Sequence, residues 1–174
     1  LGRDLGISHN TVKTWIQLLE ISGVIHLVYP YFKNLGKRLI KSPKLYFSDV
    51  GLASWLMGIQ EVGQVQTHPL RGALFETLVI NEVKKYLDNH GLPWKMYFYR
   101  DQGGLEVDLV LEAGLKQLLV EIKASYTAQL ADQDNLLEVS RLLGFSQAQR
   151  AVLYAGDQSH TTQGAKFLNW QRAF

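Results

Sequence analysis

Three charged residues lie inside two strongly apolar segments near the middle of the chain. Asp108 belongs to the segment LEVDLVLE, and Glu121 and Lys123 belong to the segment KQLLVEIKAS. Charges inside a packed core are costly unless they are paired, so residues of these types at these positions need a partner or a role. Two carboxylates beside an ammonium group are suited to hold a divalent cation and to orient a water molecule next to it.

The two segments are predicted to be antiparallel strands joined by a turn centred on Ala113 and Gly114. With that turn, residue 108 pairs with residue 119, and side chains alternate between the two faces of the hairpin. Asp108 and Glu121 would then lie diagonally on one face, with Cβ atoms roughly 7 Å apart, close enough to share one cation. The other face is wholly aliphatic and is predicted to form the core.

A third carboxylate lies on the apolar face of a predicted helix. Residues 69–91 have apolar side chains at helical spacing, with Pro69 near the first turn and Gly91 just beyond the end. Glu76 falls inside the apolar arc of this helix. A carboxylate in a packed interface needs a partner, and the cation proposed for the two strands would provide one.

The segments after residue 69 are predicted to follow the order helix, three strands, helix, strand. The strands are expected at 94–100, 105–112, 116–125 and 148–156, and the second helix at 128–144. The fold class is therefore α/β, or α+β overall, with an αβββαβ domain at 69–174 built on a central mixed sheet.

Residues 1–58 are predicted to form a separate unit, a winged helix-turn-helix truncated at its N-terminus. Ser8 is expected to cap a helix that ends near Gly23, with a buried stripe of Val12, Ile16 and Leu19. Strands at 24–32 and 44–49, a basic loop at 33–43 and a helix at 50–58 complete this unit. The aperiodic residues 59–68 are the predicted domain boundary. Because the chain begins inside a helix, at a residue other than Met, we expect it to be part of a longer protein.

Composition limits the possible classes of protein. The net charge is +2, from 18 basic and 16 acidic residues, which argues against a polybasic coat but permits a local basic patch. There is no Cys, so disulfides and thiolate metal sites are excluded. No apolar run approaches the ~20 residues that cross a bilayer, and no signal peptide is evident. We expect a soluble, cytoplasmic protein that has no membrane partner.

The charged residues form an ordered set of motifs. They read R-G-x-x-x-E from Arg71 to Glu76, then Asp108, then E-x-K from Glu121 to Lys123. In the αβββαβ order this set resembles the PD-(D/E)XK nuclease fold. In detail it is similar to the restriction-nuclease-like domain found C-terminal to AAA+ ATPase modules in many bacterial and archaeal proteins, where a winged helix precedes that domain. The blocks LYFSDVGLASWLMG, RGALFETLVINEV, FYRDQGGLEVDLVLE and LLVEIKAS match the family pattern in order.

The resemblance implies a metal-dependent hydrolysis of DNA phosphodiester bonds, with RNA not excluded as a substrate. The implied catalytic residues are Glu76, Asp108, Glu121 and Lys123, and the implied ligands of Mg²⁺ or Mn²⁺ are Asp108, Glu121, the Ile122 carbonyl and Glu76. Lys123 would position or activate the attacking water. These 174 residues contain no G-x-x-x-x-G-K-[ST] motif, so ATP would bind only to an upstream AAA+ module of the same full-length chain.

Alternative readings remain open at this point. The chain could be a catalytically inactive module that tethers an upstream ATPase to DNA or to a protein. Lys13, Lys37, Arg38 and Arg71 are the predicted nucleic-acid contacts, and Lys33, Lys41 and Lys44 would extend that footprint, but a solvated loop has the same composition. Arg100 and Asp101 could contact substrate or form a local ion pair, and Glu106 and Gln133 are expected at the surface.

Overall fold

The fold is described from a computed structural model that covers residues 6–31, 40–145 and 149–173. Its helices are α2 (His9–Ile21), α3 (Val50–Leu56), α4 (Val62–Thr67), α5 (Arg71–Asn89) and α6 (Asp134–Leu143). Its strands are β1 (Ile25–Pro30), β2 (Lys44–Phe47), β3 (Lys95–Arg100), β4 (Glu106–Ala113), β5 (Lys116–Lys123), β6 (Gln149–Tyr154), β7 (His160–Thr161) and β8 (Lys166–Asn169). Short 3₁₀ turns lie at Leu130–Gln133 and Trp170–Arg172. The predicted order of elements from α5 to β6 is confirmed.

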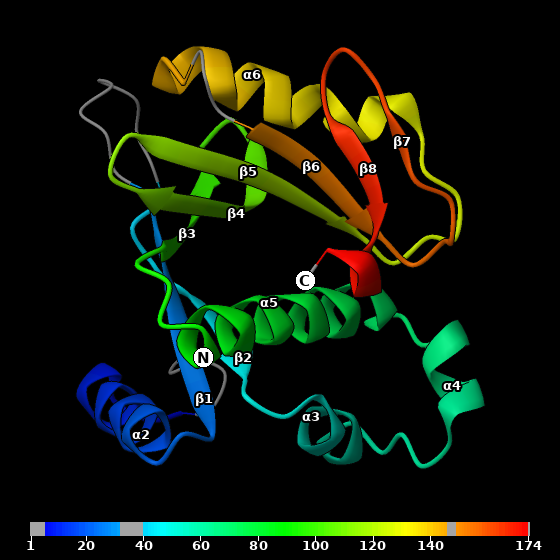
Figure 1. Ribbon diagram of the computed structural model, residues 1–174. Helices are drawn as coiled ribbons and strands as arrows, with labels where there is room; N and C mark the ends of the chain where they lie inside the picture. The colour runs from blue at the N-terminus through cyan, green and yellow to red at the C-terminus, as the bar shows by residue number, and fades with distance from the viewer. Residues whose placement is uncertain (1–5, 32–39, 146–148, 174) are drawn as a thin grey trace.

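All the described strands join in one mixed sheet of eight strands, in the order β2-β1-β3-β4-β5-β6-β8-β7 (Figure 1). The central strand β4 is antiparallel to both of its neighbours, β3 and β5, whereas β6 is parallel to both β5 and β8. A parallel neighbour requires a crossover connection, and α6 supplies the one between β5 and β6. The predicted α+β class with a central mixed sheet is therefore confirmed.

Helices cover both faces of the central strands (Figure 1). On one face, Val107, Val110 and Leu119 pack with Leu136 and Val139 of α6. On the other face, an equally apolar cluster joins α5 to the strands. It contains Val79, Ile80, Val83 and Leu87 of α5 with Leu109, Leu111, Val120 and Ile122 of the strands. The prediction of a single buried face was wrong, because both faces of this hairpin are core.

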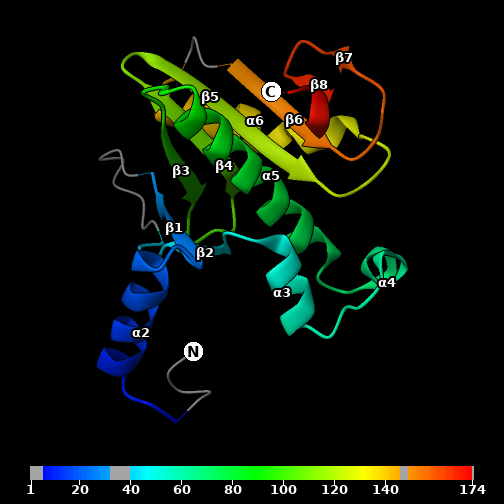
Figure 2. The same ribbon diagram turned by 60° about the horizontal axis from the view of Figure 1, so that its bottom comes forward.

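The hairpin of β1 and β2 extends the same sheet. β1 runs parallel to β3, pairing Tyr29 with Tyr97, and the backbone N–H of Tyr31 donates to the Phe98 carbonyl at 2.7 Å. The Asn81 side chain on α5 donates to the Phe47 carbonyl at 2.8 Å. The hairpin thus brings residues of the first predicted unit against the second, and α3 packs beside α5, while α2 projects away from the sheet (Figure 2). The division at residues 59–68 stays a prediction.

Local details differ from the sequence expectations at two places. The predicted linker at 59–68 contains the short helix α4, because the Gln64 side chain accepts a hydrogen bond from the Glu61 backbone N–H at 3.1 Å and caps its start. Ser8 caps α2 as predicted, with the Thr11 N–H donating to its hydroxyl at 3.1 Å. The expected buried stripe on α2 is wrong, because none of this helix is fully buried.

None of the described helices combines the length and hydrophobicity needed to cross a bilayer.

A close approach of two loops depends on Gly156, just beyond β6. A Cβ atom at this position would lie 2.1 Å from the Tyr126 carbonyl oxygen and 2.6 Å from the Tyr154 ring. We expect Gly156→Ala to lower the free energy of unfolding by about 1–3 kcal/mol, because backbone has to move to admit the methyl group.

Gly63 in α4 provides a matched control, because a Cβ there would meet nothing within 4 Å. Gly63→Ala should leave stability unchanged or raise it by up to about 1 kcal/mol, through helix propensity. Urea denaturation of the two variants measures the difference. Equal stabilities for both would contradict the close approach.

Candidate active site

An irregularity in β4 sets the direction of Asp108. Tyr97 pairs with Val110 but Tyr99 pairs with Val107, so two residues of β4, Asp108 and Leu109, stand opposite one residue of β3. This is a β-bulge, which breaks the alternation of side chains between faces. Val107 and Val110 consequently both pack toward α6, although they are three residues apart. The bulge thus changes the direction in which the Asp108 side chain points.

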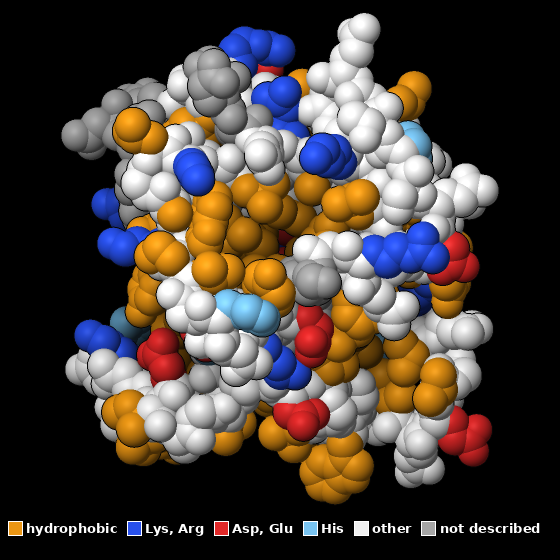
Figure 3. All heavy atoms as spheres, in the orientation of Figure 1, with side chains coloured by type: hydrophobic (Ala, Val, Ile, Leu, Met, Phe, Trp, Pro, Cys, Tyr) orange, Lys and Arg blue, Asp and Glu red, His pale blue; other side chains and the backbone are white. Residues whose placement is uncertain are grey.

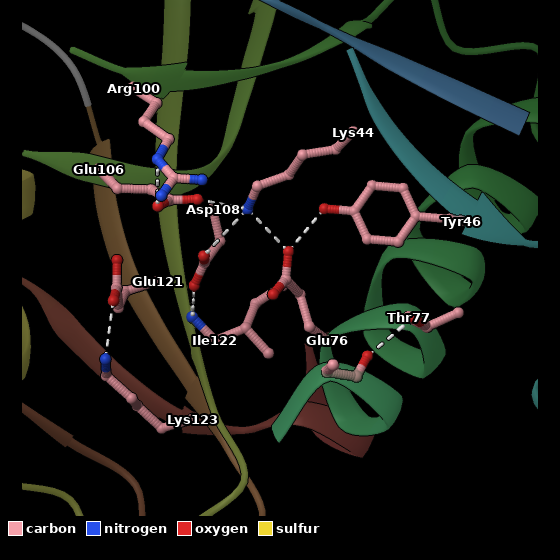
Figure 4. Close-up of polar contacts among 11 residues, drawn as sticks. Lys44, Tyr46, Glu76, Thr77, Arg100, Glu106, Asp108, Glu121, Ile122 and Lys123 are labelled. Carbon is pink, nitrogen blue, oxygen red and sulfur yellow. Dashed lines mark hydrogen bonds and ion pairs between the residues drawn. The ribbon is translucent and has the colours of Figure 1, made fainter. Parts of the chain in front are cut away.

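The two central strands part at the same point. Pairing of β4 with β5 ends at Leu109 and Val120, whereas β5 stays paired with β6 as far as Lys123. The Asp108 carboxylate fills the opening and accepts a hydrogen bond from the Ile122 backbone N–H at 2.9 Å. The predicted register was wrong by two residues, because Val110, not Asp108, pairs with Leu119. Asp108 nevertheless lies beside the strand that carries the E-x-K motif (Figure 4).

A lysine from β2 lies among three carboxylates at this opening (Figure 4). The Lys44 Nζ is 2.7 Å from Glu106 Oε1, 2.9 Å from Glu76 Oε1 and 3.5 Å from Asp108 Oδ1. The Tyr46 hydroxyl donates to the same Glu76 oxygen at 2.6 Å. The predicted need of Glu76 for a partner is confirmed, and in this structure the partners are Lys44 and Tyr46.

Glu121 and Lys123 form the other half of the site. The Lys123 Nζ donates to Glu121 Oε1 at 2.8 Å. The Glu121 residue is only 6% exposed, and its second oxygen, Oε2, is buried with no hydrogen-bond partner among the described residues. A buried carboxylate oxygen without a donor is costly, so this atom is a position where a further ligand would be stabilising.

Burial shifts the protonation of these groups. Desolvation, followed by the charge of Glu76, raises the pKa of Asp108 to about 6. Desolvation, followed by the charge of Asp108, raises the pKa of Glu121 to about 7. Burial alone would lower the pKa of Lys44, but Glu76 and Asp108 raise it above its usual range. The pKa of Lys123 is likewise raised, because its bond to Glu121 outweighs its burial. Both lysines are therefore cationic at neutral pH.

The remaining predicted site residues have varied surroundings. The Arg71 guanidinium donates to the Ala124 carbonyl at 2.5 Å and lies 5.1 Å from the centre of the Tyr126 ring. Arg71 thus ties the start of α5 to the residue after Lys123. Lys13 is exposed on α2. The residues Lys33, Lys37 and Arg38 lie outside the described part of the chain.

Each of the flanking polar residues has a partner among the described residues. Arg100 forms an ion pair with Glu106, with Nε and Oε2 3.2 Å apart. Glu106 is therefore not a plain surface residue, because it links Arg100 to Lys44. The Asp101 side chain accepts a hydrogen bond from the Leu105 N–H at 3.1 Å, within its own loop. Gln133 accepts a hydrogen bond from the Thr162 hydroxyl at 2.6 Å, which holds the loop before β8.

Sequence reasoning missed the two residues that contact Glu76 most closely. The sequence places Lys44 at the start of a strand and in the phosphate footprint with the basic residues of the preceding loop, and it places Tyr46 only in the same strand. Their alternation on β2 puts both on one face of the hairpin, which was readable from the sequence. The pairing of β1 with β3, which brings that face over α5, had no local sequence signal.

Within the described ranges, no group of three or more His, Asp or Glu residues has the arrangement of a metal site.

An apolar cavity of about 510 Å³ lies between α5 and the sheet, and Figure 3 shows hydrophobic side chains around this hollow. It is lined by residues such as Tyr86, Trp94 and Leu168 and includes none of the charged residues of the candidate site.

The raised carboxyl pKa values predict an unusual dependence of stability on pH. In the unfolded chain both carboxyls titrate near pH 4, so between about pH 4 and 7 the folded protein binds more protons than the unfolded one. The free energy of unfolding should therefore fall as pH rises through this window. Glu121→Gln removes one of these charges and should be more stable than the wild type at pH 8, by about 1–3 kcal/mol, but not at pH 4.

The control is Glu82→Gln, at a more exposed carboxylate that pairs with Lys85 on α5. It should not change the pH profile measured by urea denaturation. A Glu121→Gln difference that is equal at both pH values would contradict the raised pKa.

Comparison with known proteins finds two family models that match different parts of the chain. Residues 71–172 match the domain of unknown function DUF4143, and residues 1–62 match the domain of unknown function DUF8612. Two relatives, the uncharacterized proteins Mb2031c of Mycobacterium bovis and Rv2008c of Mycobacterium tuberculosis, are each 29% identical over 157 residues. The match covers 90% of this chain and 34% of each relative, so the chain spans about a third of their length.

No solved structure matches the chain significantly. The DUF4143 match covers more than half of the sequence and includes Glu76, Asp108, Glu121 and Lys123. The chain belongs to the DUF4143 family.

Proposed function

We propose that this chain is the C-terminal, DNA-processing part of an AAA+ ATPase-type protein and that it hydrolyses DNA phosphodiester bonds with Mg²⁺ or Mn²⁺. The observation that carries the proposal is the Glu121 Oε2 atom, which has no hydrogen-bond partner in the described part of the chain and is buried beside Asp108 at the opening between β4 and β5. The αβββαβ order and the E-x-K motif add the resemblance to PD-(D/E)XK nucleases. A cytoplasmic location and a winged-helix role for residues 1–58 belong to the same proposal.

The donor set at the opening fits a hard divalent cation. Asp108, Glu121 and the Ile122 carbonyl would provide oxygen ligands only, the type that Mg²⁺ and Mn²⁺ prefer. The free Glu121 oxygen offers a lone pair that no described donor uses. Once bound, such a cation acts as a Lewis acid, which lowers the pKa of a water and offsets phosphoryl charge.

The protonation state of Lys123 limits the role that this residue can have in hydrolysis. Because the pKa of Lys123 is raised, its side chain is an ammonium at neutral pH and has only hydrogen-bond donors. It can therefore orient a water or a phosphate oxygen, but it is a poor acceptor for a proton. Of the two roles expected for Lys123, we propose the positioning role.

Arg71 connects the helix α5 to the end of β5, and Glu76 connects it to β2. The bond from Arg71 to the Ala124 carbonyl fixes the end of β5 against the first turn of α5. Glu76, one turn further along, is held by Lys44 and Tyr46. We propose that Arg71 positions the E-x-K strand end, and that DNA backbone contacts come from exposed basic residues such as Lys13.

A second candidate function is a catalytically inactive module that tethers an upstream ATPase to DNA or to a protein. It is favoured by Lys44, whose ammonium already offsets the charges of three carboxylates in this structure. The large exposed side chains of Trp15 and Trp55, 53% and 71% exposed, would suit contact with a protein partner. Metal binding separates the two candidates.

Metal should stabilise the protein and support nicking of plasmid DNA. A saturating excess of Mn²⁺, a hundredfold over Kd, would raise the free energy of unfolding by about 2.7 kcal/mol. Asp108→Asn should remove both effects, while Lys123→Ala should keep the metal-dependent stabilisation and lose the nicking. Calorimetry and a plasmid assay on the same preparations measure both.

Asp88→Asn, at an exposed carboxylate of α5 paired with Lys84, is the matched control and should behave like the wild type. An unchanged melting temperature of the wild type on addition of Mn²⁺ would reject the nuclease and leave the binding module.

A further inference from the structure

Lys44 brings a cation from one matched region of the chain to carboxylates of the other. Lys44 belongs to residues 1–62, whereas Glu76, Glu106 and Asp108 belong to residues 71–172. Its ammonium lies within 3.5 Å of an oxygen atom of each of the three. The Lys44 side chain is only 19% exposed, so this is an inserted cation and not a surface ion pair.

The ammonium and a divalent cation would need the same oxygen atoms. Asp108 has two, of which Oδ2 accepts from the Ile122 N–H and Oδ1 faces Lys44. A metal ion bound through Oδ1 would lie within a few ångströms of a cationic nitrogen. Like charges at that distance repel by at least about 1 kcal/mol even in water, and by more where solvent is excluded. The Lys44 ammonium and the divalent cation therefore exclude each other from Asp108 or weaken each other's binding there.

The hairpin fixes the backbone of Lys44 but not its ammonium. Tyr46, two residues on, is 4% exposed and packs in the core against α5, so β2 is held in place. The Lys44 side chain has a flexible four-carbon stem, and its Nζ lies 5.4 Å from the centre of the Phe98 ring. Rotation of this stem can remove the charge from the carboxylates without any movement of the strand.

We propose that Lys44 is an internal counter-ion that competes with the divalent cation for Asp108, so that metal binds fully only when the Lys44 side chain withdraws. The inference rests on the proposed metal-dependent function and adds its regulation. Because Lys44 is carried by the hairpin of β1 and β2, the seating of the N-terminal region against α5 sets the metal affinity of the site. Any partner that draws the ammonium away would switch the site on.

The direct test is the affinity for Mn²⁺ of the Lys44→Met variant, measured by titration calorimetry without DNA. Methionine keeps the apolar stem beside Phe98 and removes the charge. The variant should bind Mn²⁺ about tenfold or more tightly than the wild type, on the scale expected for loss of a unit charge at about 4 Å. Lys44→Arg should bind as weakly as the wild type. Lys85→Met, at an exposed lysine paired with Glu82, is the control and should change nothing.

A second measurement needs no substitution and does not depend on the stability of the variant. Acetylation of Lys44 in the wild type, followed by peptide mass spectrometry, should accelerate when Mn²⁺ saturates the protein, while acetylation of Lys85 stays constant. Equal Mn²⁺ affinities of the wild type and Lys44→Met, with unchanged labelling, would overturn the competition and leave the metal-dependent function standing. Absence of Mn²⁺ binding in every variant, including Lys44→Met, would overturn both.

Discussion

The cost of burying carboxylates governs the arrangement of this molecule. Helices pack on both faces of the middle of these strands, so a charged side chain there has no open face to occupy. Four charged residues lie instead at the end of the hairpin where β4 and β5 are no longer paired with each other: Glu106, Asp108, Glu121 and Lys123. Asp108 uses this opening to bond the Ile122 N–H, which would otherwise lack a ladder partner. The bulge, the divergence of the strands and the ion pairs thus together reduce the cost of burying these carboxylates.

Local patterns were sufficient to predict most elements of the fold. Helical periodicity with Pro69 and Gly91 located α5, and apolar runs located β3 to β6, because these signals depend on neighbours in sequence. The predicted register of β4 and β5 failed because the hairpin turns at Gly114 and Leu115, with Ala113 paired with Lys116, and not at Ala113 and Gly114. The bulge at Asp108 and Leu109 was not predicted either, because nothing in the run LEVDLVLE marks it. The two strands β7 and β8, which add to the sheet beyond β6, were not predicted.

In the candidate site, too, the features that depend on neighbours in sequence were predicted, and those that depend on distant strand pairing were not. The position of Glu76 on an apolar helix face was enough to predict that it needed a partner. The identity of that partner depends on the pairing of β1 with β3, far apart in sequence, so it could not be read from periodicity. Glu121 and Lys123 were recognised because an E-x-K motif is local. Lys44 was expected in the phosphate footprint and not beside Glu76, because a lysine next to a basic loop usually stays solvated.

The carboxylates on the two sides of the opening between β4 and β5 are compensated to different degrees, and Asp108 lies next to both sides. On one side, Lys44 compensates Glu76, Glu106 and Asp108. On the other side, Lys123 satisfies only one oxygen of Glu121, and the second oxygen has no described donor. A site built only for stability would distribute its cations so that every buried oxygen is paired. The uneven distribution leaves an acceptor at the end of the E-x-K strand, which is where a ligand has most to gain in free energy.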